Sequence, residues 1–101
     1  MALQIIKATG SEVTFSNIED FNRQKSAMAA ILQKYIRYFR DFWNPEYPTL
    51  THIEYCPDAC NLSLYSDELE IAGFVLSENL INNLETECRQ ILCKLLKGEL
   101  L

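Results

Sequence analysis

The chain has little glycine, proline or histidine: its 101 residues include three glycines, three prolines and one histidine. No phosphate-binding pattern of the G-x-G-x-x-G or P-loop type occurs, and no nucleophile elbow. The single histidine has no third group arranged to orient it as a base toward a cysteine. We therefore expect neither enzymatic activity nor a bound cofactor.

Long apolar runs are also missing. No run reaches the roughly 18 residues that a membrane-spanning helix needs, and the opening residues lack the pattern of a secretory signal. There is no repeat and no linker-like stretch. With 49% apolar and 23% charged residues, the composition is typical of a folded chain with a modest core. We expect one domain over residues 1–101, cytoplasmic and not in a membrane.

Basic residues are missing from a long central stretch. Residues 41–87 contain ten acids and no Lys or Arg, whereas residues 21–40 contain five bases and no acid. This division predicts a basic helix edge and an acidic sheet-and-turn surface, which would steer a partner. The alternative is that surface charge only keeps the domain soluble. The net charge of −5 argues against nucleic acid as a partner.

The first elements are short β-favouring runs. Leu3–Lys7 and Val13–Phe15 flank Gly10, which can supply the positive φ that a hairpin turn often needs. A hairpin is the simplest interpretation, and one strand followed by a loop is the alternative. This hairpin could pair within the chain or across a dimer.

A long uninterrupted apolar pattern follows. Ser16 and Glu19 have the S-x-x-E spacing of a capping box, and from there to Trp43 the sequence has neither proline nor glycine. Pro45 ends the pattern because the residue before a proline avoids the α region. The spacing predicts a helix over Asn17–Trp43.

After this helix, the apolar residues are spaced as in β-strands. Three short runs separated by turn residues predict an antiparallel meander over Thr49–Cys56, Asn61–Tyr65 and Leu69–Leu76. Both faces of the last run are apolar, which predicts a central strand or one covered twice.

A final amphipathic helix is predicted over Glu78–Lys97, with Ser77 as its N-cap and Gly98 as its stop. The predicted fold is therefore α+β and two-layered. It has an N-terminal strand or hairpin, a long helix, a three-stranded antiparallel meander and a C-terminal helix.

The apolar side chains of the long helix cover an arc of roughly 160° at 100° per residue. Packing on one sheet needs about 100°, so the surplus must be covered by the C-terminal helix, a second copy or another protein. Aromatic and arginine side chains are enriched at binding hot spots. The candidate interface residues are Tyr35, Tyr38, Phe39, Phe42 and Trp43, with Arg37 and Arg40 setting orientation.

The four cysteines are expected to be free thiols, because no secretory signal accompanies them. Cys88 falls on the apolar stripe of the last helix and Cys93 falls off it. His52, Cys56 and Cys60 are weak candidates for a metal or thiol site. Their C-x3-C spacing differs from the usual C-x2-C of zinc knuckles, so no metal is predicted.

These observations favour a small non-enzymatic protein-interaction module, an adaptor or regulator. It would be a homodimer or a subunit of a complex, self-associating through the aromatic-rich first helix. The alternative is an acidic inhibitor or nucleic-acid mimic that acts on a nucleic-acid enzyme through Asp67, Glu68 and Glu70. A third possibility is the Cys/His metal or thiol-redox site.

Overall fold

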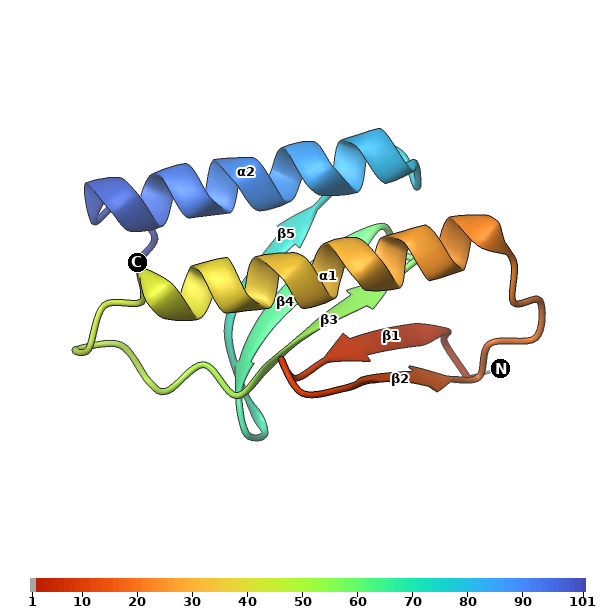
Figure 1. The fold of residues 1–101 in the computed structure, drawn as a ribbon, viewed down its shortest axis with the longest axis horizontal. Coiled ribbons are helices and arrows are strands. Elements are labelled where there is room, and N and C mark those ends of the chain that lie inside the picture. The colour runs from red at the N-terminus through yellow and green to blue at the C-terminus, as the bar shows by residue number, and fades with distance from the viewer. Residues whose placement is uncertain (1) are drawn as a thin grey trace.

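A computed structural model describes residues 2–101. Five antiparallel strands form one sheet in the order β2-β1-β3-β4-β5, and two helices lie side by side on one side of it (Figure 1). This arrangement confirms the predicted two-layer α+β fold. The elements are β1 (Ile5–Ala8), β2 (Val13–Ser16), α1 (Arg23–Asp41), β3 (His52–Cys56), β4 (Asn61–Ser66), β5 (Leu69–Val75) and α2 (Ile81–Lys97).

The N-terminal hairpin is confirmed, and it pairs within the chain. β1 pairs with β2 on one side and with β3 on the other. Gly10 has a φ of +92°, and a side chain on it would collide with the guanidinium of Arg40. Glycine is favoured at this turn because its positive φ is one that other residues rarely adopt, and a Cβ here would also force the end of the Arg40 side chain to move.

The predicted start of the long helix is wrong by six residues. Ser16 is not a cap: it is the last residue of β2 and pairs with Ile5. Asn17 then turns the chain with a φ of +59°. The helix begins at Arg23, and its N-cap is Asn22, whose side chain accepts a hydrogen bond from the Lys25 backbone N–H at 3.0 Å. Strand pairing therefore takes precedence over the local capping pattern.

The two possible caps make a matched pair of substitutions. Asn22→Ala is expected to lower the free energy of unfolding by about 1 kcal/mol, because it leaves an N-terminal N–H of α1 without its acceptor. Ser16→Ala is expected to change it by no more than about 0.5 kcal/mol. Thermal unfolding followed by circular dichroism measures both. A larger loss of stability from Ser16→Ala than from Asn22→Ala would mean that Ser16, and not Asn22, caps the helix.

The start of α2 also differs from the prediction. Its N-cap is Leu80, which makes no side-chain cap bond. The hydroxyl of Ser77, the predicted cap, instead accepts a hydrogen bond from Asn83 Nδ2 at 3.2 Å. The predicted end is confirmed: Gly98 adopts the left-handed conformation at φ +69° and donates its N–H to Leu95 O.

The prediction that the last strand is central or covered twice is wrong. β5 is an edge strand that pairs only with β4, and the Val75 side chain is 77% exposed. Both helices lie on the same side of the sheet, so the residues of β5 that point away from them meet solvent. Apolar residues on both faces of a strand do not reveal which face is covered.

The core lies between the sheet and the helices. The strand register aligns Ile6, Tyr55 and Leu62 in one row facing the helices, with neighbouring residues facing away. Within residues 2–101, no helix is both long enough and apolar enough to span a bilayer. The largest fully buried side chains are Tyr55, Phe39, Ile6, Met28, Leu32, Ile36, Ile53, Leu62, Leu64, Leu84, Ile91 and Cys88.

Candidate interaction surface

Two of the predicted interface aromatics lie in the core. Phe39 is fully buried and Tyr35 is 4% exposed, with 6.0 Å between their ring centroids. α2 lies beside α1 on the same side of the sheet (Figure 1), so the wide apolar arc of α1 has a second element to pack against. These two side chains therefore hold the helices on the sheet and are not open to a partner.

Two more of the predicted residues form hydrogen bonds with the segment that follows α1. Trp43 is partly buried, and its indole N–H donates to Pro48 O at 2.9 Å. Arg40 donates from Nε to Leu50 O at 3.2 Å and from Nη2 to Thr51 O at 2.6 Å. These bonds tie the end of α1 to the chain entering β3, a positioning role within the domain.

The remaining predicted residues are exposed. Arg37 donates from Nη2 to Gly10 O at 3.2 Å, on the hairpin side of α1. Tyr38 is 42% exposed and Phe42 is 49% exposed. One helical turn separates Tyr38 from Phe42, so the two lie on the same side of α1. The predicted aromatic surface is thus reduced to this pair.

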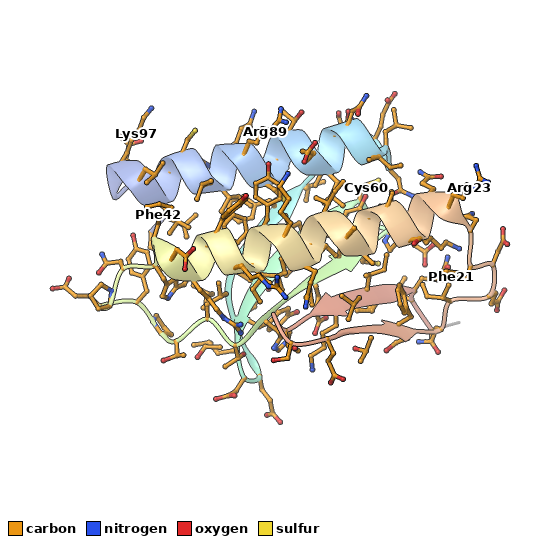
Figure 2. All side chains as sticks on the ribbon, in the orientation of Figure 1. Phe21, Arg23, Phe42, Cys60, Arg89 and Lys97 are labelled. Atoms are coloured by element: carbon orange, nitrogen blue, oxygen red, sulfur yellow. The ribbon has the colours of Figure 1, made fainter. Side chains whose placement is uncertain are left out.

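This pair borders the seam between the two helices. One turn before Tyr38, Lys34 Nζ lies 3.4 Å from Glu85 Oε2 of α2. Leu96 of α2 is 59% exposed. It follows Glu85 by eleven residues, about three helical turns, so it lies on the side of α2 that faces α1. The next residue, Lys97, lies at the same end of the helical layer as Phe42 (Figure 2). We call Tyr38, Phe42 and Leu96 the seam patch.

Charge divides between the two layers as predicted from the sequence. The helices hold eight of the nine Lys and Arg residues but only three of the fourteen acids, a net charge of +5. The strands and loops therefore hold a net charge of −10. The seam patch is apolar in a basic layer, which favours an acidic ligand over a basic one.

The three acids proposed for mimicry are all exposed, but they differ in their hydrogen bonding. Asp67 and Glu68 are exposed at the turn between β4 and β5. Glu70 lies over Gly73 and accepts a hydrogen bond from Ser63 Oγ at 2.8 Å. Only the first two present free carboxylates at the tip of this turn.

The sheet face away from the helices, which we call the open face, carries a polar cluster that the sequence analysis missed as a unit. His52 Nε2 lies 3.1 Å from Glu54 Oε2, and its ring stacks on Tyr65 with 4.9 Å between centroids. Burial, together with the neighbouring Glu54 and Glu70 carboxylates, raises the pKa of Tyr65. The alternation of polar residues along β3 and β4 could have revealed this cluster.

The polar side chains of the open face are hydrogen-bonded to one another. Ser63 donates its hydroxyl to Glu70 and accepts a hydrogen bond from Asn61 Nδ2 at 2.8 Å. One ring nitrogen of His52, Nε2, is hydrogen-bonded to Glu54, and the other, Nδ1, lies 3.1 Å from Thr51 Oγ1. This arrangement stabilises strand pairing and holds its polar groups in mutual bonds.

The weak metal candidates are not brought together. His52 and Cys56 share the open face, as predicted from their spacing. Cys60 lies in the following turn at φ +50°, and its thiol donates to Pro57 O at 3.8 Å. Among residues 2–101, no three His, Cys, Asp or Glu side chains are grouped to hold a metal ion.

All four thiols are free, as predicted, with Cys88 buried and Cys93 exposed.

No protein-family model matches this sequence, and no curated protein or solved structure shows significant similarity to it. The features that bear on function are therefore the seam patch and the division of charge.

Proposed function

We propose that this protein is a non-enzymatic interaction module. Its seam patch would bind a segment of another protein in which apolar side chains are flanked by acidic residues. The observation that carries the proposal is the exposure of Tyr38, Phe42 and Leu96 in a helical layer of net charge +5. Exposed aromatic and large aliphatic side chains that lie close together are typical of binding surfaces.

The aromatic part of the seam patch is held in place before a partner binds. The Tyr38 ring packs edge-to-face on the buried Tyr35 ring, with 5.6 Å between centroids and 80° between planes. Tyr35 is in turn fixed in the core beside Phe39. A side chain that is already ordered loses little conformational entropy on binding, so its contacts contribute more of their energy to affinity.

The charge of the helical layer favours a different protein over a second copy at this surface. Two seam patches face to face would bring two layers of net charge +5 together, and like charges across an interface oppose association. Arg89 and Lys97 of α2 lie on the same layer (Figure 2). A segment with carboxylates flanking its apolar side chains would meet these cations with opposite charge.

Selection from a random peptide display library against the purified protein tests this proposal. We expect the enriched peptides to combine acids with Leu, Phe or Trp. Tyr38→Ala and Phe42→Ala should each raise the Kd of a selected peptide about tenfold, the effect of losing an interface anchor. Raising the salt concentration should also weaken binding.

Phe21→Ala is the matched control. Phe21 is also an exposed phenylalanine, at 58%, but it lies at the opposite end of the molecule from Phe42 (Figure 2). Its substitution should leave the Kd unchanged. Enriched peptides that are basic, or that bind the Tyr38→Ala and Phe42→Ala variants as tightly as the original protein, would refute the proposal.

A further inference from the structure

The free edge of β5 is only partly protected against pairing with another strand: it has a register shift near Glu70, and its regular part after this shift has no charged residue. β5 spans seven residues, Leu69–Val75, whereas β2 at the other edge of the sheet spans four. Its sequence, LEIAGFV, has no lysine and no proline. Natural proteins commonly shorten such edges or place Lys or Pro in them, because unpaired backbone groups recruit another strand.

The hydrogen-bond pattern shows which backbone groups face outward. Leu76 donates its N–H to Cys60 O at 2.7 Å at the end of the pairing between β4 and β5. Positions alternate along an antiparallel ladder, so Phe74 directs its N–H and C=O toward β4. Gly73 and Val75 consequently direct theirs to the free edge.

The side of α2 nearest this edge carries opposite charges two turns apart. Glu87 and Gln90 border a hollow together with Val75. Further along the same side of α2, Lys94 Nζ lies 5.3 Å from the centroid of the Phe74 ring. An acidic group, a neutral group and a basic group thus follow one another above the edge.

We propose that the β5 edge pairs with β5 of a second copy of this chain, antiparallel and around a twofold axis, to form a continuous ten-stranded sheet. An axis close to Gly73 sets this glycine opposite its own copy and Ala72 opposite Phe74. The register shift opposite Leu64 and Tyr65 leaves Ile71 without a partner on β4, so the regular part of the edge is residues 72–75. A twofold axis makes one patch complementary to itself.

The charges on α2 suit this partner. The same axis makes the two α2 helices antiparallel, so that Glu87 of each copy lies toward Lys94 of the other. Opposite charges thereby meet across this interface twice, which favours the antiparallel register. The seam patch lies on the other side of α2 and stays open, so dimerisation and the proposed partner binding are separate properties.

Molar mass in solution tests the interface. The original chain of 11.7 kDa should sediment as a dimer at about 100 µM. Val75→Pro removes an outward N–H but no bond to β4, and edge strands tolerate proline at such positions. This variant should sediment as a monomer with an unchanged circular dichroism spectrum. Val75→Thr keeps the N–H and should remain a dimer.

A charge exchange provides a second test that does not touch β5. Glu87→Lys and Lys94→Glu should each weaken the dimer at least tenfold, because each places like charges opposite one another. An equimolar mixture of the two variants should dimerise again. One chain then has cations at positions 87 and 94, its partner has carboxylates at both, and opposite charges meet across the interface. A monomeric original chain at 1 mM, a dimeric Val75→Pro variant, or a mixture no tighter than its components would overturn the proposal. None of these results depends on peptide binding at the seam patch.

Discussion

Phe39→Ala is expected to lower the free energy of unfolding by about 3–5 kcal/mol, whereas Phe42→Ala should lower it by about 1 kcal/mol or less. Phe39 is fully buried against Tyr35, so its removal costs both transfer free energy and a cavity. Phe42 is half exposed and leaves no enclosed cavity. Small domains are stable by only about 5–15 kcal/mol in total, so the first change removes a large share.

Urea unfolding followed by circular dichroism and by Trp43 fluorescence measures both variants. The urea midpoint should fall steeply for Phe39→Ala and little for Phe42→Ala, with a similar dependence on urea concentration in each case. Equal losses would mean that Phe42 also belongs to the core, and the seam patch would then lose its aromatic anchor.

These two phenylalanines show what helical periodicity could and could not predict. The apolar arc correctly indicated a long helix with more apolar surface than one sheet covers. It could not separate Phe39 from Phe42, because the position of α2 decides which part of the arc is buried (Figure 1). That position depends on long-range packing of residues such as Leu84 and Ile91.

The boundaries that the sequence missed have a similar cause. Ser16 has a good capping pattern, yet its pairing with Ile5 in the hairpin keeps it in a strand. The run in β5 is apolar on both faces, yet it lies at an edge because no further element pairs with it within residues 2–101. Each error arises where a contact between distant parts of the chain decides between two local conformations.

The candidate site was predictable to the extent that it depends on one element. The cations of α1 and the surplus width of its apolar arc follow from the sequence of a single helix, but which of its aromatics are exposed does not. Leu96 joins them only because α2 packs beside α1, and the polar cluster of His52, Glu54 and Tyr65 requires the register of two strands. Spacing along one element predicts which residues share a face, but it does not predict which residues of another element lie beside them.

Two buried ionisable groups, the phenol of Tyr55 and the thiol of Cys88, should make the protein progressively less stable as the pH rises above about 9. The hydroxyl of Tyr55 is buried and donates to Asn79 Oδ1 at 2.7 Å. Burial raises the pKa of this phenol above its ordinary 10.0, and the nearby Cys60 and Cys56 thiols raise it further. Burial likewise raises the pKa of the Cys88 thiol above 9.0, with added contributions from neighbouring carboxylates.

The direction of the effect follows from which state holds the proton. Because the folded state has the higher pKa at both groups, the unfolded state releases these protons first as the pH rises. Their contribution to stability is complete below the unfolded pKa values and is lost above about pH 9 for Cys88 and pH 10 for Tyr55. Each group then costs about 1.4 kcal/mol per pH unit until the pH reaches its folded-state pKa, a substantial loss beside the total stability of a small domain.

Variants that lack one acidic hydrogen separate the two contributions. Tyr55→Phe keeps the ring in the core and should reduce the fall of the free energy of unfolding above pH 10 by about 1.4 kcal/mol per pH unit. Cys88→Ala should do the same from about pH 9, and Cys93→Ala, which changes an exposed thiol, should leave the slope unchanged. Urea unfolding at intervals between pH 8 and pH 12 gives these slopes. Parallel profiles for the original chain and all three variants would show that neither buried group controls alkaline unfolding.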